Sequence, residues 1–353
     1  MIQRRAVVRS LAYVVFNVVV AGVIAEGVLL LMLHVPGLTA ASPRPMRRLV
    51  QQIYRHFNRA LIQFDPQCSR YDAGITYTLK PGTCTFENIE FRNEIRVNRV
   101  GLRDEEASLE GPDVILLGDS HTMGWGVEHE QTFGRVLARL SGLKVLNAGI
   151  SSYGTARERM LLDRLDVSRL RILIVQYSDN DLLENRAFRD HGNHLPIMST
   201  AQYDNASRYY TRQRSYYPGK YIYRLVMKAS RLEPPEPDVT AMEPATPVEE
   251  ARLFINALVH AGRAPLGQAQ VIVLEVNEQL QDRRAFIVAL DGVKRDAGNP
   301  PYIQQLTTLD LSSVLTPGDF FVLDDHMNAR GHEAVGTALA ALLRSSGAGD
   351  RNK

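Results

Sequence analysis

The chain has few cysteines and almost no net charge, and these two features argue against particular classes of binding site. Its 353 residues include two cysteines, Cys68 and Cys84, with no histidine between them at ligand spacing, which argues against a cysteine-based metal site. The 41 lysines and arginines nearly balance 39 aspartates and glutamates, and no basic run is interleaved with base-stacking aromatics. We therefore expect no nucleic-acid partner. The cysteines either remain free thiols or form a disulfide, which would add roughly 3 kcal/mol of stability.

One long apolar run lies near the N-terminus. Between residues 11 and 33 the only strongly polar residues are Asn17 and Glu26. At about 1.5 Å per residue, such a helix crosses roughly 30 Å of hydrocarbon, whereas a signal peptide has an apolar core of only about 7–15 residues. We expect a cytoplasmic tail over residues 1–10 and an uncleaved transmembrane anchor over residues 11–34. Glu26 is costly inside a bilayer and should face a partner helix or be protonated.

Arginines on both sides of this segment leave its orientation open under the positive-inside rule. Those before it are Arg4, Arg5 and Arg9, and those after it are Arg44, Arg47, Arg48, Arg55 and Arg59. The second group is interleaved at helical spacing with Met46, Leu49, Val50, Ile53, Phe57 and Leu61. This pattern predicts an amphipathic helix that either lies on anionic lipid or packs on the following domain.

The periodicity of the chain changes after this helix. Residues 35–110 comprise the juxtamembrane helix and short alternating strands, which predict a small β-rich collar. Over residues 111–347, apolar runs alternate with helical stretches, which predicts a mostly parallel sheet covered by helices, with residues 320–323 as the last strand. Residues 185–248 interrupt the alternation, and we expect an insert that is either a lid or a partly disordered excursion.

Polar residues follow several of the predicted strands. Ser120 follows the run Val-Ile-Leu-Leu-Gly-Asp, Gly149 and Asn180 follow the next two strands, and Asp-Asp-His at residues 324–326 follows the last. The carboxyl ends of parallel strands lie at one edge of a sheet, where ligands bind. We therefore expect these groups to converge.

Together these residue types suit nucleophilic acyl transfer. Ser120 requires a base to take its proton, and His326 is the candidate base. Asp324 is the candidate acid that orients the imidazole, with Asp325 as the alternative. Each residue alone could be an ordinary cap, turn or core residue, but their joint occurrence favours catalysis.

The tetrahedral intermediate of acyl transfer also needs hydrogen-bond donors. The candidates are the backbone N–H groups of Ser120 and Gly149 and the side-chain amide of Asn180. His121 is expected to be a pocket wall and His332 a helix-face residue. We predict no metal site, because the two histidines at 191 and 194 lack a third clear ligand.

Four blocks of this sequence, in order, resemble the SGNH, or GDSL, hydrolase family. They are Gly118-Asp119-Ser120 with its continuation over 122–127, Asn147-Ala148-Gly149, Asn180-Asp181, and residues 324–332. The resemblance covers about residues 113–345. Two positions depart from the family: Ser178 replaces a usual glycine, and Leu323 stands three residues before His326, where the acid is usual. The acid must therefore be Asp324 or Asp325, and the two-residue spacing found in some branches favours Asp324.

The resemblance implies a three-layer α/β/α sandwich with a flavodoxin-like sheet, and hydrolysis or transfer of acyl esters without a cofactor. Residues 98–103 also look like the lead-in of bacterial envelope members, whose domains are typically exported. Membrane-anchored members of this kind often act on O-acetyl groups of polysaccharides. We therefore expect a single-pass inner-membrane serine esterase with a periplasmic catalytic domain and an acylated carbohydrate substrate.

The alternatives are an O-acetyltransferase with the same triad, a lysophospholipase with a lipid substrate, and a non-catalytic scaffold that binds a membrane-bound acyltransferase.

Overall fold

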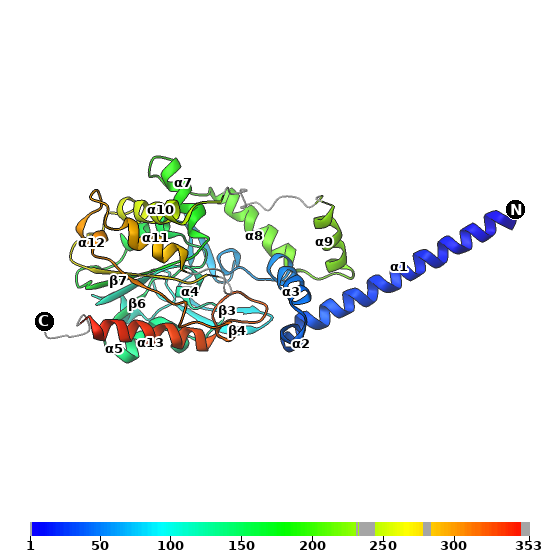
Figure 1. Ribbon diagram of the computed structural model, residues 1–353, viewed down its shortest axis with the longest axis horizontal. Helices are drawn as coiled ribbons and strands as arrows, with labels where there is room; N and C mark the ends of the chain where they lie inside the picture. Colours follow the sequence, from blue (N-terminus) through cyan, green and yellow to red (C-terminus); the bar gives the residue numbers. More distant parts are fainter. Residues whose placement is uncertain (1, 231, 233–243, 278–283, 347–353) are drawn as a thin grey trace. The chain divides into compact units, whose positions relative to one another are not determined.

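The computed structural model in Figure 1 describes residues 2–230, 232, 244–277 and 284–346. The chain forms two compact units. The N-terminal unit comprises Met1–Ala60, Tyr209–Thr240 and Val322–Asp324, and the α/β unit comprises Leu61–Arg208, Ala241–Phe321 and Asp325–Lys353.

The N-terminal unit is helical. It contains α1 (Ile2–His34), α2 (Pro36–Ala41), α3 (Arg44–Phe57), the end of α8 (Thr200–Arg214) and α9 (Lys220–Ala229). Within α1, the segment Arg9–His34 is long and apolar enough to cross a membrane. Its last turns differ from the rest, because Leu29, Met32 and Leu33 are buried in the protein.

Helix α3 does not present its apolar face to the surroundings. Val50, Ile53, Tyr54 and Phe57 are all buried. These four side chains are covered by protein, whereas Met46 of the same helix is exposed. Contact of this helix with anionic lipid remains a prediction from the sequence.

The collar consists of two antiparallel hairpins. The first pairs β1 (Ser69–Asp72) with β2 (Thr76–Leu79), and the second pairs β3 (Gly82–Asn88) with β4 (Phe91–Val97). Cys68 and Cys84 form a disulfide that joins the start of the first hairpin to β3. Short 3-10 turns lie on either side of the hairpins, at η1 (Ile62–Phe64) and η2 (Glu106–Leu109).

A parallel sheet forms the centre of the α/β unit. In the described part of the chain it has five strands: β5 (Val114–Leu117), β6 (Val145–Asn147), β7 (Ile172–Tyr177), β8 (Gln270–Glu275) and β9 (Thr307–Leu309). Their spatial order is β6-β5-β7-β8-β9, and every neighbouring pair is parallel. This is the flavodoxin-like order, so the predicted α/β fold class is confirmed.

The chain reverses direction across the sheet at β5. The connection from β5 leads to β6 on one side, and the connection from β6 returns to β7 on the other. The carboxyl edge between β5 and β7 is therefore the switch point at which open α/β sheets bind ligands. Ser120 follows β5 directly and Asn180 follows β7.

Helices cover both faces of the sheet (Figure 1). One layer contains α5 (Phe133–Ser141) and α13 (Ala329–Ser345), and the other contains α6 (Thr155–Leu162), α7 (Asp181–Asp190), α10 (Pro247–His260) and α11 (Ala285–Val293). The remaining short elements are α4 (Ser120–Met123), α12 (Pro301–Gln304), η3 (His129–Gln131) and η4 (Pro317–Asp319). The chain between α7 and α10, predicted to be an irregular insert, contains helices α8 and α9.

One predicted strand is wrong. Residues 320–323 do not join the sheet, and the last strand is β9, ten residues or more upstream. Phe320 and Leu323 are apolar because they are buried within a loop, where Phe320 forms a single antiparallel bridge with Met327. A four-residue apolar run cannot by itself distinguish a strand from a packed loop.

Candidate active site

Ser120 lies at the amino end of the short helix α4, immediately beyond the carboxyl end of β5. Asp119 is the N-cap of this helix, and its carboxylate accepts a hydrogen bond from the His121 backbone N–H at 2.8 Å. Burial raises the pKa of Asp119. Asp119 thus orients the turn that carries Ser120, as expected of a capping residue.

His326 contacts the serine directly. Its Nε2 lies 2.7 Å from the Ser120 Oγ, although 206 residues separate the two in sequence. Both side chains are largely buried, each with 7% of its surface exposed. A neutral imidazole in this position can accept the hydroxyl proton, which is the contact that a serine nucleophile requires.

The other nitrogen of His326 has a carboxylate beside it. Within the α/β unit, Asp325 Oδ1 lies 3.2 Å from Nδ1. Asp324, which the sequence favoured as the acid, belongs to the N-terminal unit, where its Oδ2 accepts a hydrogen bond from the Tyr54 hydroxyl at 2.6 Å. Both aspartates are buried. Asp325 is therefore a candidate for the acid beside Nδ1, and Asp324 has a partner on α3.

The loop that carries His326 is closed by backbone hydrogen bonds. The Phe321 N–H donates to the His326 carbonyl at 3.0 Å, and the Asn328 N–H donates to the Asp319 carbonyl at 2.9 Å. Asn328 then caps α13, because its side-chain oxygen accepts from the backbone N–H groups of Arg330 and Gly331. His326 thus lies on a short loop, closed by hydrogen bonds, at the start of a helix.

Trp125 forms one wall of the imidazole site. Its ring stacks on His326 with 4.6 Å between centroids and 15° between planes. The indole in turn contacts the second collar hairpin, with Phe86 at 4.9 Å and Phe91 at 6.1 Å, both edge to face. His121 lies on the site too, with its ring centroid 4.8 Å from that of His326, consistent with a pocket-wall role.

Sequence reasoning treated Trp125 only as part of the block that continues from the serine. Its contact with His326 depends on tertiary structure, because the two residues are far apart in sequence. The only signal in the sequence was its position five residues after Ser120 in the first block.

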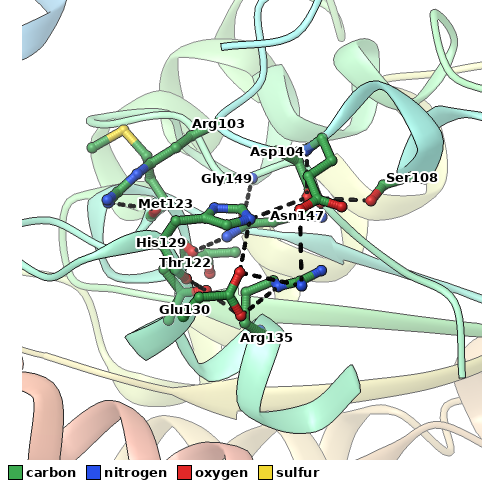
Figure 2. A network of polar contacts seen from close by, with 12 residues as sticks. Arg103, Asp104, Ser108, Thr122, Met123, His129, Glu130, Arg135, Asn147 and Gly149 are labelled. Carbon is green, nitrogen blue, oxygen red and sulfur yellow. Dashed lines mark hydrogen bonds and ion pairs between the residues drawn. The ribbon is translucent and has the colours of Figure 1, made fainter. Parts of the chain in front are cut away.

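Arg103 and Asp104 support the loops around the serine (Figure 2). The buried Arg103 guanidinium donates to the carbonyls of Gly124 and, at 2.6 Å, Val127, which flank Trp125. The Asp104 carboxylate accepts from the Asn147 backbone N–H at 2.7 Å, at the end of β6. Burial lowers the pKa of Arg103 to about 10 and raises that of Asp104.

Gly149 is pressed against α4. A Cβ at this position would lie 2.4 Å from the Met123 backbone nitrogen, a distance that real Cβ atoms do not reach, so glycine is required here. The Gly149 N–H donates to Asn147 Oδ1 at 3.0 Å, and Asn147 Nδ2 donates to the Thr122 carbonyl at 2.7 Å. As an oxyanion donor, Gly149 would have to share its N–H with Asn147.

Asn180 lies at the same edge of the sheet, at the amino end of α7. Its side chain is exposed, whereas Asp181 is buried and accepts from the Thr155 hydroxyl at 2.8 Å. Ser178, which occupies a usual glycine position, donates to the Val276 carbonyl at 2.8 Å. The Ser178 hydroxyl thus links the end of β7 to the residue that follows β8.

His332 is a structural residue. Its Nδ1 accepts from the Phe133 backbone N–H at 3.2 Å, and burial lowers its pKa to about 3, so it remains neutral. In the described chain, the side chains at 105, 129 and 130 could approach one metal ion. However, the Arg135 guanidinium lies 3.2 Å from Glu130, and we assign no metal to this group (Figure 2).

No family model and no curated protein matches this chain. Solved structures that resemble it include a protein assigned to the G-D-S-L family of lipolytic proteins from Desulfitobacterium hafniense DCB-2, with 13% identity over 65% of this chain and 98% of that chain and a TM-score of 0.36. A family two carbohydrate esterase from Cellvibrio japonicus shares 14% identity over 66% of this chain and 61% of that chain, with a TM-score of 0.37. A family two carbohydrate esterase from Clostridium thermocellum shares 10% identity over 69% of this chain and 66% of that chain, with a TM-score of 0.36.

At these identities and TM-scores, the likeness decides nothing about activity.

Proposed function

We propose that this protein is a serine esterase of the SGNH type that works through an acyl-serine intermediate. The observation that carries the proposal is the contact of 2.7 Å between Ser120 Oγ and His326 Nε2, with a carboxylate 3.2 Å from the opposite ring nitrogen. This is the order of groups that serine hydrolases use, at the edge of the sheet where α/β proteins bind ligands.

The reaction begins when Ser120 Oγ attacks the ester carbonyl and His326 Nε2 takes the hydroxyl proton. The carbonyl oxygen becomes an oxyanion, for which the Ser120 and Gly149 N–H groups and the Asn180 amide are the proposed donors. The tetrahedral intermediate then collapses, the ester C–O bond breaks, and the imidazolium returns its proton to the departing alcohol. The acyl group remains on Ser120.

A second nucleophile completes the cycle. Water gives up a proton to His326 and attacks the acyl carbon, which releases a carboxylic acid and restores the Ser120 hydroxyl. A sugar hydroxyl in place of water would make the same intermediate an O-acetyltransferase, because the two reactions share their first half.

For the triad acid we propose one of the two adjacent aspartates, and the contact with Nδ1 favours Asp325. An acid in this place fixes the tautomer of the imidazole and stabilises the imidazolium. The preference for Asp324 that family spacing suggested remains the competing assignment, and exchange of each carboxylate for an amide separates the two.

For the substrate we propose acyl groups, O-acetyl above all, on cell-envelope carbohydrate. Support comes from the resemblance of residues 98–103 to exported envelope members and from the apolar helix Arg9–His34. The disulfide between Cys68 and Cys84 suits an oxidising compartment. We therefore propose a single-pass inner-membrane protein whose α/β unit lies in the periplasm. A reporter that works only in the periplasm should be active when it is fused to the C-terminus.

The activity is tested with the full chain in detergent, a fluorophosphonate probe and a panel of p-nitrophenyl esters and acetylated glycans. We expect the wild type to be labelled and to hydrolyse short esters, and Ser120→Ala to do neither. Ser345→Ala is the matched control, because this exposed serine ends α13 and should leave both signals unchanged. Folded wild type that is neither labelled nor active would favour a scaffold that binds a membrane acyltransferase.

A further inference from the structure

Glu26 of α1 has a partner within the N-terminal unit. Its carboxylate accepts hydrogen bonds from the backbone N–H groups of Tyr221 at 3.2 Å and Ile222 at 3.0 Å, in the first turn of α9. Only 5% of the surface of Glu26 is exposed. The carboxylate thus satisfies N–H groups that have no partner inside their own helix, in a position favoured by the helix dipole.

Lys220 fixes the same turn from the other side. Its buried ammonium group donates to the Phe57 carbonyl at 2.7 Å, at the end of α3, and to the Gln213 carbonyl at 2.8 Å, near the end of α8. Burial lowers its pKa to about 8. The start of α9 is therefore held against α1 and against the ends of two other helices.

Because the first turn of α9 contacts Glu26, the place of Glu26 along α1 fixes how far this turn lies from the start of the apolar segment. At 1.5 Å per residue, Glu26 lies roughly 25 Å along the helix from Arg9, while the hydrocarbon core of a bilayer is about 30 Å thick. If α1 spans the membrane from Arg9, Glu26 lies near the far boundary of the hydrocarbon. The first turn of α9 then begins where lipid headgroups begin.

The exposed side chains of α9 and of the turn before it are of the kinds found at the boundary between lipid and water. Tyr216, Tyr217 and Tyr223 are about half exposed, and Val226 is 59% exposed. Tyrosine is enriched at the boundary between lipid and water because its ring is apolar and its hydroxyl polar. Val50, Ile53 and Phe57 of α3 are buried, whereas α9 exposes an aromatic and an apolar side chain.

The same stretch of chain also carries exposed cations. Arg212, Arg214 and Lys228 are exposed. Basic side chains close to a leaflet are attracted to anionic headgroups by about 1 kcal/mol each. A surface of tyrosine, valine and exposed cations therefore matches an anionic phospholipid leaflet.

We propose that residues 212–229, the interfacial segment, bind the anionic phospholipid leaflet of the same bilayer that α1 crosses. Glu26 ties the first turn of α9 to α1 by hydrogen bonds. If α1 crosses the membrane, the interfacial segment is therefore held beside a leaflet. This inference rests on the proposed membrane span and is independent of the proposed esterase chemistry.

The test places a fluorophore on the interfacial segment of the full chain in nanodiscs. Val226→Cys is labelled with an NBD dye under non-reducing conditions, in which Cys68 and Cys84 remain paired. Lipids that carry a quencher near the headgroup report contact with the leaflet. The control is Ser345→Cys, an exposed position at the end of α13 in the α/β unit.

We expect dye at position 226 to be quenched several-fold more than dye at position 345. The quenching should fall when phosphatidylglycerol is replaced by phosphatidylcholine, and it should fall with added salt. Equal quenching at both positions would overturn the proposal. Strong quenching at 226 that is independent of lipid charge would overturn the preference for anionic lipid.

Two further measurements separate this inference from failures of another kind. Lys228→Glu with Arg214→Glu should weaken quenching at 226 in anionic nanodiscs and leave it unchanged in neutral ones. Hydrolysis of a short soluble ester by the same variants should stay at the wild-type rate. If the wild type itself shows no ester hydrolysis, that result counts against the proposed function and leaves the proposed lipid contact unaffected.

Discussion

The Trp125 indole lies parallel to the His326 imidazole, with 4.6 Å between the ring centroids. The other sides of the indole contact Phe86 and Phe91 of the collar, so the β-hairpin reaches the candidate base through one aromatic side chain. The collar is therefore part of the support of the candidate site.

Trp125→Leu should lower kcat for a short ester about tenfold, a loss of about 1.4 kcal/mol in the transition state. The imidazole would lose the flat surface that holds its plane, whereas the binding of a small ester should change little, so KM should stay near its wild-type value. Trp125→Phe should restore most of the rate. Equal losses with both substitutions, or an effect on KM alone, would contradict a role in positioning the base.

Trp125 is also the only tryptophan in the chain, so its fluorescence reports on its neighbour. Replacement of the stacked imidazole by an amide should therefore change that emission. We expect the full chain with His326→Gln to differ from the wild type in emission intensity. Identical emission from the two proteins would show that the stacked arrangement is not maintained in solution.

Asp325→Asn and Asp324→Asn should have different effects. If Asp325 orients the imidazole, its replacement by an amide should lower kcat by about 10⁴, as an incorrect tautomer does in other serine hydrolases. Asp324→Asn keeps an oxygen that can accept from Tyr54 and should cost far less. Thermal melting of both variants checks that they fold. The reverse order of activities would assign the acid to Asp324.

Gly149→Ala should lower both activity and stability. The new methyl group would lie 2.4 Å from the Met123 backbone nitrogen, so either α4 or the loop after β6 must move. Overpacking of this kind typically costs about 1–3 kcal/mol. The matched control is Gly292→Ala, where nothing lies within 4 Å of the added Cβ. A Gly149→Ala protein with a wild-type melting temperature and rate would show that the close packing is wrong.

Glu158 should make the protein less stable as the pH rises. It is fully buried, both of its carboxylate oxygens are without a hydrogen-bond partner in the described structure, and burial, then Asp181 and Asp119, raise its pKa well above 4.5. The folded state therefore holds the proton more tightly than the unfolded state. Stability from this group is full below its unfolded pKa and is lost as the pH rises through the folded pKa.

Glu158→Gln removes that titration. We expect urea unfolding at pH 7.5 to require more denaturant for Glu158→Gln than for the wild type, and the difference to shrink at pH 4.5. Glu130→Gln, at an exposed position, should show neither effect. A glutamine variant that is less stable than the wild type at pH 7.5 would mean that the buried carboxylate has a partner in solution.

The fold class could be predicted because buried parallel strands are encoded as continuous apolar runs, such as Val114–Leu117, that alternate with helices. The run at 320–323 misled for the same reason, because a loop that packs against the core is equally apolar. The position of Ser120 at the carboxyl edge of the sheet could be predicted from the end of β5. The same reasoning placed His326 after a strand, but it lies in a loop, and its contact with Ser120 depends on how that loop packs.

Other features were not encoded in local patterns. The amphipathic spacing of α3 specified an apolar face but not what covers it, and the structure buries it in protein. The partner of Glu26 could be anticipated only as an unidentified helix, because α9 follows it by nearly two hundred residues. The contact of Asp325 with the imidazole depends on loop geometry that adjacent aspartates in a sequence do not determine.

The most direct test of the account is the mass of the full chain quenched early in its reaction with p-nitrophenyl acetate. Ser120 should gain the mass of one acetyl group, located by fragmentation to the peptide that contains Ser120, at the same time as a burst of p-nitrophenol. The His326→Gln protein should show neither. An acetyl group on another residue, or turnover in Ser120→Ala at the wild-type rate, would contradict the central claim.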